Sequence, residues 1–136
     1  MELQIFSKRI AITGALLILT IKYLLRPHWS FPEPVGFMLG IAPNLIASFL
    51  LPFFACWLLS GKENLPARLF RITHTAELRN FCILSFLLLV INEYFQQLPV
   101  FGRTFDYFDI LFSLIGLLLS FFVFGRKMHQ SYRLAA

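Results

Sequence analysis

The chain has 136 residues, of which 58% are hydrophobic and 14% are charged, and its mean hydropathy is +0.73. A soluble domain usually carries about 25% charged residues, and its apolar residues do not gather in long uninterrupted runs. The composition therefore excludes an ordinary soluble domain and predicts an integral membrane protein. We attribute the formal net charge of +5 to orientation in the membrane and contact with anionic lipid, so no nucleic-acid partner is expected.

Four apolar stretches follow one another along the chain, at about residues 10–25, 35–60, 81–98 and 107–124. Each approaches the roughly 20 residues that a helix needs to cross a hydrocarbon core about 30 Å thick. Each stretch also offers one face of small or polar residues for close packing. The sequence predicts an all-α integral membrane protein, an antiparallel bundle of four transmembrane helices that forms a single domain over residues 1–136.

The first stretch and the basic residues together predict how the chain lies in the membrane. Lys8 and Arg9 precede an apolar run as in a signal peptide, but no small-residue cleavage site follows, so we expect an uncleaved helix. Three basic residues fall on one side of the predicted membrane, Lys22, Arg26 and Arg103. The other nine fall on the opposite side, which the positive-inside rule assigns to the cytoplasm. We therefore expect both termini to be cytoplasmic, in a multi-pass protein of a bacterial cytoplasmic (inner) membrane.

The second stretch places Gly36, Gly40, Asn44 and Ser48 four residues apart, which gives a face of small residues with Pro43 beside it. Two roles are open for Asn44: it satisfies a backbone group freed by the proline, or it lines a site. The polar segment that follows, residues 62–80, is either a short amphipathic helix along the inner leaflet or an ordinary loop.

Cysteine and aromatic residues give no sign of a site. Cys56, Cys82 and three scattered histidines match no metal-ligand spacing, so we expect reduced, buried cysteines and neither a metal nor another cofactor. The 17 phenylalanines are expected to face lipid.

Polar residues concentrate where the third and fourth stretches approach each other. Asp106, Asp109, Ser113, Gly116 and Ser120 are spaced three, four, three and four, so they share one helix face. Glu93 and Gln97 fall near the outer end of the third stretch, while the inner half of the bundle carries nothing comparable. Ionisable residues at membrane depth cost about 2.5–3.5 kcal/mol each on insertion scales, so they call for an explanation.

Two interpretations explain these residues. In the structural one, Glu93 pairs with Lys22 or Arg103, and Asp106 caps the fourth helix. In the functional one, Glu93 and Asp109 form an acid–base pair in a poorly solvated pocket, and Arg103 and Lys22 hold a phosphate or carboxylate. The candidate catalytic residues are Glu93, Asp109 and Arg103. The candidate substrate-binding residues are Gln97, Asp106, Asn44, Lys22 and Ser113.

The string E-YFQ-Q-LPVF-GR-TF-D-YF-D-ILFSLI-G, from Glu93 to Gly116, resembles the VanZ-like family of small bacterial membrane proteins. The segment APNLIASFLLPF in the second stretch is similar to the Pro-Asn segment of compact members. Ser113 departs from the pattern, because members often have asparagine there. The resemblance implies a four-helix fold with its site at these residues. The founding member is associated with resistance to the lipoglycopeptide antibiotic teicoplanin, and most relatives have no assigned activity.

We therefore expect a cell-envelope protein whose outward-facing polar site binds an amphiphilic substrate, either a lipid-linked cell-wall precursor or a lipoglycopeptide such as teicoplanin. Membrane lipids are the other expected partners. Whether the site also modifies its ligand stays open. One alternative is a non-catalytic accessory or scaffold subunit, whose polar seam fixes helix packing or docks a partner protein. Another is a minimal proton-coupled carrier, which the nearly bare inner half disfavours.

Overall fold

The computed structural model describes residues 2–28, 30–96 and 106–135, and within these ranges the regular structure is helical, with no strands. Four helical segments are long and apolar enough to cross a membrane: Glu2–His28, Glu33–Leu59, Thr75–Phe95 and Tyr107–Arg133. The prediction of an all-helical protein with four such segments is confirmed. The elements in chain order are α1 (Glu2–Leu19), η1 (Thr20–Leu25), α2 (Arg26–His28), α3 (Glu33–Leu59), α4 (Leu65–Leu69), α5 (Thr75–Gln96) and α6 (Tyr107–Ala135).

Several helix ends differ from the predicted boundaries. The first helix begins at Glu2 rather than near residue 10, the third begins at Thr75 rather than 81, and the fourth continues to Ala135 rather than ending near 124. At the start of α5 the reason is visible. The Glu77 carboxylate accepts hydrogen bonds from the Thr73 backbone N–H at 2.6 Å, the Thr73 hydroxyl at 2.7 Å and the His74 N–H at 3.1 Å. A helix can thus extend into polar residues beyond its apolar part. The apolar runs therefore underestimate the lengths of the helices.

The polar segment between the second and third membrane helices contains one short helix, α4. The Asn64 side chain accepts a hydrogen bond from the Ala67 N–H at 3.3 Å and caps its start. Of residues 62–80, residues 62–74 form a connecting segment that contains this short helix, and residues 75–80 are the first part of α5. The position of α4 along the inner leaflet stays a prediction.

The first membrane helix changes its hydrogen-bond pattern partway along. The Arg26 N–H donates to the Ile21 carbonyl, five residues back, which is the pattern of the π-helical segment η1. A π turn accommodates one more residue than an α turn, so it changes the direction of the side chains that follow. Lys22 lies inside this segment and Arg26 comes directly after it.

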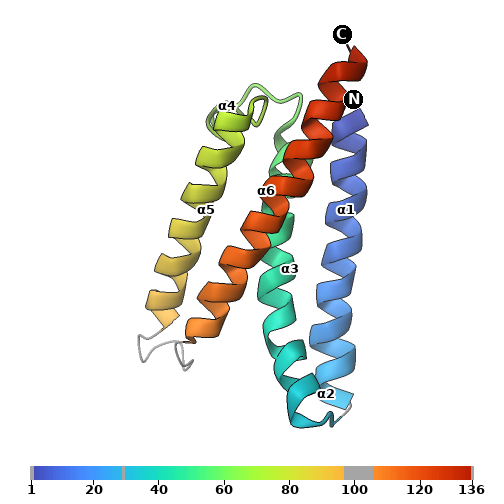
Figure 1. The fold of residues 1–136 in the computed structure, drawn as a ribbon, viewed down its shortest axis with the longest axis vertical. Helices are drawn as coiled ribbons and strands as arrows, with labels where there is room; N and C mark the ends of the chain where they lie inside the picture. Colours follow the sequence, from blue (N-terminus) through green and yellow to red (C-terminus); the bar gives the residue numbers. More distant parts are fainter. Residues whose placement is uncertain (1, 29, 97–105, 136) are drawn as a thin grey trace.

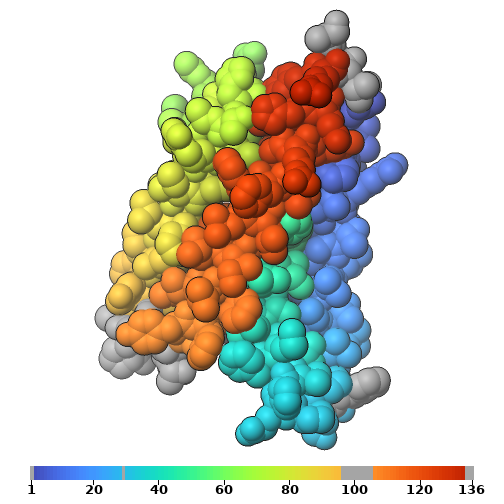
Figure 2. Space-filling model, viewed as in Figure 1, coloured from blue at the N-terminus to red at the C-terminus, as the bar shows by residue number. Residues whose placement is uncertain are grey.

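The four long helices pack in a definite order. In Figure 1, α3 lies between α1 and α6, and α5 packs chiefly against α6, with the N- and C-terminal ends of the chain at the same end of the molecule. Figure 2 shows α6 crossing the face of the molecule, with α5 on one side and α3 and α1 on the other. The outermost helix, α5, therefore has the least support from its neighbours.

An aromatic core fills the half of the bundle that lies near the termini. Phe53 and Phe124 are completely buried, and their ring centroids lie 5.3 Å apart in an edge-to-face contact. The Phe6 ring packs against Phe53 from α1 at 6.2 Å. The expectation that the phenylalanines face lipid is therefore wrong for this group, which instead joins α1, α3 and α6.

Most of the remaining apolar surface points outward. Only 11% to 28% of the residues in the most apolar window of each membrane helix are buried within the chain. Large side chains such as Leu16, Leu24, Leu88, Leu118 and Phe122 are each at least half exposed. An apolar surface of this extent must be shielded from water, and lipid shields it when the helices are long enough to cross a membrane. The architecture is that of a multi-pass membrane protein.

The tightest approach between helices occurs at Gly116 of α6. A Cβ atom added there would overlap the Ser48 Oγ and the Leu45 carbonyl oxygen of α3, and it would lie 3.1 Å from the Phe49 nitrogen. Only glycine leaves room for the α3 backbone at this point. Small residues allow such contacts in membranes, where packing rather than the hydrophobic effect holds helices together.

We predict that Gly116→Ala destabilises the bundle by about 1–3 kcal/mol, the usual cost of overpacking, because α3 and α6 must separate to admit the methyl group. Thermal unfolding of the purified protein in detergent measures this effect.

The matched control is Gly125→Ala, on the same helix. A Cβ atom at Gly125 would meet only the Leu78 Cδ2, at an ordinary contact distance of 3.6 Å. This variant should keep the stability of the parent protein. Equal losses in the two variants would contradict a specific close contact at Gly116.

Candidate functional site

A cavity of about 550 Å³ opens among the membrane helices in the half of the bundle away from both termini. Side chains from η1, α2, α3, α5 and α6 or its N-cap line it. The polar and charged ones are Lys22, Arg26, Asn44, Asn92, Glu93, Asp106, Asp109 and Ser113. A volume of this size suits a small molecule or the head group of a lipid, and we call it the polar cavity.

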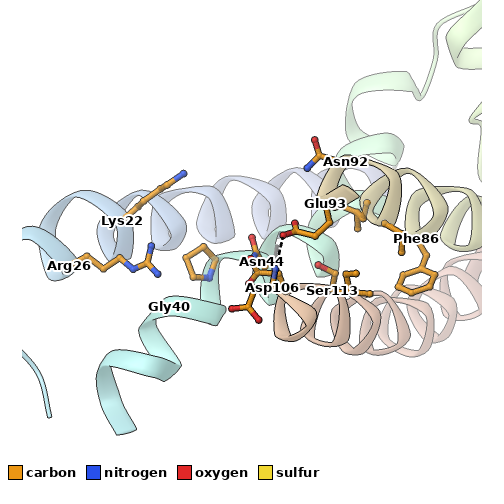
Figure 3. A pocket seen from close by; sticks show the side chains of 14 residues that line it. Lys22, Arg26, Gly40, Asn44, Phe86, Asn92, Glu93, Asp106 and Ser113 are labelled. Carbon is orange, nitrogen blue, oxygen red and sulfur yellow. Dashed lines mark hydrogen bonds between the residues drawn. The ribbon is translucent and has the colours of Figure 1, made fainter. Parts of the chain in front are cut away.

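Charges of opposite sign lie on different walls of the polar cavity. Figure 3 shows Lys22 and Arg26 on one side and Glu93 and Asp106 on the other. Asn44 of α3 also lines the cavity. Asp109, in the first turn of α6, adds a third carboxylate to the acidic wall. The cavity therefore presents a basic wall from η1 and α2 and an acidic wall from the facing ends of α5 and α6.

Hydrogen bonds fix the acidic wall to the start of α6. The Asp106 Oδ1 accepts from the Phe108 N–H at 2.9 Å, and the Asp106 carbonyl accepts from the Asp109 N–H at 3.2 Å, so Asp106 is the N-cap of α6. The Asp106 N–H in turn donates to the Glu93 Oε1 at 3.4 Å. Glu93 is 7% exposed, and this bond ties α5 to the beginning of α6 (Figure 3).

The basic wall depends on a glycine in α3. A Cβ atom added at Gly40 would lie 3.2 Å from the Arg26 Nη2, closer than ordinary contact. The absence of a side chain at Gly40 therefore lets the guanidinium group lie against the α3 backbone. Lys22 comes from the π-helical segment one turn earlier, so both cations reach the same cavity.

Six of the eight residues predicted from the sequence line the polar cavity: Glu93, Asp106, Asp109, Asn44, Lys22 and Ser113. Gln97 and Arg103 lie outside the described residues, so their predicted roles stay predictions. Asn44 lines the cavity, and among the described residues its side chain makes no hydrogen bond to the backbone near Pro43, which favours the second of its two predicted roles.

Arg26 is the main residue that the sequence analysis did not assign to the site. From the sequence it served only as one of the three basic residues on the side opposite the predicted cytoplasm. One signal was available: Arg26 follows Lys22 by four residues, a spacing that places two side chains on one side of a helix. Gly40 was expected to serve helix packing, whereas it makes room for a side chain of the site.

The opposite end of the bundle is less bare than expected. A second cavity of about 520 Å³ lies there, lined partly by Lys62, Arg71 and Thr73 of the loop region. The sequence did not predict a cavity at this end. The polar groups of this second cavity come from loops and helix ends, and the buried rings of Phe53 and Phe124 occupy the core on that side of the bundle.

Among the residues that the structure describes, no group of three or more His, Cys, Asp and Glu side chains is placed to hold a metal ion. Cys56 and Cys82 are free and half-buried. In the acidic wall, the carboxylates of Glu93 and Asp106 accept hydrogen bonds from the backbone at the start of α6.

Comparisons of the chain with protein-family models, curated proteins and solved structures find no significant match. The function is therefore inferred from the chemistry of the polar cavity.

We predict that Asp106→Ala lowers the free energy of unfolding by about 1 kcal/mol, the usual cost of losing an N-cap acceptor. Asp106→Asn should retain most of that stability, because an amide oxygen can accept the Phe108 N–H equally well. Chemical denaturation in detergent compares the two variants. If both lose the same stability, the charge of Asp106 rather than its capping hydrogen bond supports α6.

Proposed function

We propose that the protein is a VanZ-like membrane protein whose polar cavity binds an anionic amphiphile at the outer surface of a bacterial cytoplasmic membrane. The observation that carries this proposal is the polar cavity with its two oppositely charged walls, set among helices whose remaining surfaces are apolar. Charged side chains at such positions are costly and are usually functional.

The basic wall supplies the anion recognition. Arg26 presents a planar guanidinium group that can bind a phosphate or carboxylate with two parallel hydrogen bonds, and Lys22 adds a second positive charge. Both side chains are exposed in the chain itself, so a ligand can reach them. A lipid-linked cell-wall precursor or a lipoglycopeptide such as teicoplanin carries an anionic group of this kind.

The acidic wall supplies groups that can exchange protons or bind a cationic part of the ligand. Glu93 is the buried carboxylate and Asp109 is the partly exposed one, so their surroundings differ. Pairs of carboxylates in different environments are the usual arrangement for acid–base chemistry. We assign Glu93 and Asp109 to that role and Asp106 to the capping of α6.

We infer an antiparallel bundle with both termini in the cytoplasm, which places the opening of the polar cavity on the outer side. Nine of the twelve basic residues lie on the side assigned to the cytoplasm, as the positive-inside rule requires. The position of both chain ends at one end of the ribbon supports the same arrangement (Figure 1).

The hydrogen bond between the Asp106 N–H and Glu93 favours a second function, a non-catalytic accessory subunit in which the polar residues hold α5 against α6. In that case removing the cations of the opposite wall would change no ligand affinity. Proton-coupled transport has less support, because the fully buried Phe53 and Phe124 close the core of the inner half with apolar groups.

To test the proposed function, binding of a polyprenyl phosphate and of teicoplanin is measured with the protein in lipid nanodiscs. We predict that Arg26→Gln and Lys22→Gln each weaken the binding of the recognised ligand roughly tenfold, the effect of losing hydrogen bonds to a charged group. Lys62→Gln, which removes a cation from the cavity at the opposite end, should leave the affinity unchanged.

A matched pair of glycine variants separates loss of the ligand from loss of the fold. Gly40→Leu should displace the Arg26 guanidinium and weaken binding. Gly36→Leu should not, because a Cβ atom at Gly36 would lie 3.9 Å from the Phe31 carbonyl oxygen, an ordinary contact distance. Thermal unfolding of both variants checks that they remain folded. Unchanged affinity in the Arg26 and Lys22 variants would reject the proposed site and leave the accessory role.

The orientation is tested by single-cysteine labelling in cells, after Cys56 and Cys82 are replaced by alanine. We predict that a membrane-impermeant maleimide labels Glu33→Cys from outside but reaches Glu63→Cys only after the membrane is opened, because these exposed positions lie at opposite ends of α3. The reverse pattern would place the polar cavity on the cytoplasmic side.

A further inference from the structure

Another hollow, which is apolar, lies on the surface of the bundle between α5 and α6. It has a volume of about 340 Å³, and we call it the α5–α6 groove. Ile83 and Leu87 of α5 and Leu114, Leu117 and Leu118 of α6 contribute to its walls. Apart from Arg79 at the end nearer the termini, its lining carries no charged side chain.

The α5–α6 groove meets the polar cavity at one residue. Phe86 lines both hollows. Figure 3 shows its side chain extending from α5 toward α6, at the end of the polar cavity farthest from Lys22 and Arg26. The two hollows are therefore neighbouring parts of one surface, with an aromatic ring at their border.

The polar cavity is deep enough that a long ligand bound in it would also extend into the α5–α6 groove. The cavity extends along α6 from Asp106 to Ser113, which is about 10 Å at 1.5 Å per residue. The groove continues along the same helix from Leu114 to Phe121, about another 10 Å. A head group drawn into the cavity lies well below the membrane surface, so the chain attached to it must continue along the bundle.

We propose that the α5–α6 groove holds the hydrocarbon chain of the amphiphile whose head group occupies the polar cavity, and that Phe86 marks the passage between the two. This inference rests on the proposed function and specifies its ligand class: a long-chain lipid that enters sideways from the bilayer. Because lipid already solvates such a chain, the groove selects it through close packing rather than through the hydrophobic effect.

The packing of the helices agrees with sideways entry. α5 is attached chiefly to α6, whereas α3 is held between α1 and α6, so the α5–α6 side is the one that opens with least loss of contact (Figure 1). Ile83, Leu87 and Leu118 are about half exposed in the isolated chain, as expected for a surface that a lipid chain covers.

The test uses hexadecyl phosphate with a photoreactive diazirine at the end of its chain, bound to the full chain in phosphatidylcholine nanodiscs. After illumination, mass spectrometry maps the labelled residues. Labels should concentrate on the groove residues of α5 and α6. Replacing Lys22 and Arg26 together by glutamine should reduce this labelling roughly tenfold or more, because the head group no longer anchors the chain.

A matched pair of variants tests the groove itself. Leu118→Trp fills the groove, whereas Leu119→Trp places the same ring on the adjacent, equally exposed position outside it; the side chains are 51% and 48% exposed. Only Leu118→Trp should reduce the labelling of Ile83 and Leu117. Equal labelling in the two variants, or labels spread evenly over the lipid-facing surface, would overturn the proposal.

Two further outcomes would overturn the proposal, because each shows that something else occupies the α5–α6 groove. If Arg79→Gln abolishes labelling while the Lys22 and Arg26 double variant does not, a lipid anchored at Arg79 occupies the groove. If illumination instead cross-links two protein chains through this face, the groove is an interface between copies.

Binding of butyl phosphate, which has almost no chain, is measured separately by phosphorus NMR. Butyl phosphate binding without groove labelling rejects the inference and leaves the proposed function standing.

Discussion

The close approach of α3 and α6 at Gly116 is the contact on which the rest of the bundle depends. Inside a bilayer the hydrophobic effect does not hold helices together, so they must meet closely enough for packing to do so. Gly116 has no Cβ atom to overlap the Leu45 carbonyl oxygen and the Ser48 Oγ of α3. One turn away, Asn44 and Ser113 are positioned by the same pair of helices and line the polar cavity. The tight contact thus determines where the cavity can begin.

The two halves of the bundle use different means to stay together. Near the termini, aromatic rings of α1, α3 and α6 form a buried core, with Phe53 and Phe124 at the centre. In the other half, α5 and α6 form one wall of the polar cavity, and the hydrogen bond from the Asp106 N–H to Glu93 connects them within that wall. The aromatic core near the termini therefore holds the helices together, while the other half of the bundle contains the polar cavity. The polar residues can persist because the fold does not rely on filling the space around them.

The sequence predicted most of this arrangement wherever the helices are regular. Asp109 and Ser113 were placed on one face because α6 is an unbroken α-helix, whose period relates spacing to direction. Helix ends were misjudged because a run of apolar residues records the hydrocarbon core and not the hydrogen bonds of Glu77 that begin α5. The buried Phe53 was not distinguished from lipid-facing rings, since hydropathy is the same for both. For Arg26 the sequence offers only its spacing of four residues from Lys22, and the contact of its guanidinium group with the α3 backbone at Gly40 depends on helix packing.

The start of α6 explains how two oppositely charged walls coexist in one cavity. The N-terminus of a helix carries a partial positive charge of about half a unit, together with N–H groups that lack partners within the helix. Asp106 accepts from one of these N–H groups, Glu93 accepts from the N–H of Asp106 itself, and Asp109 lies in the first turn. All three carboxylates thus gain stabilisation from the helix to which they are adjacent. These interactions with the start of α6 stabilise the acidic wall, which is consistent with the proposed role of Lys22 and Arg26 in binding an anion.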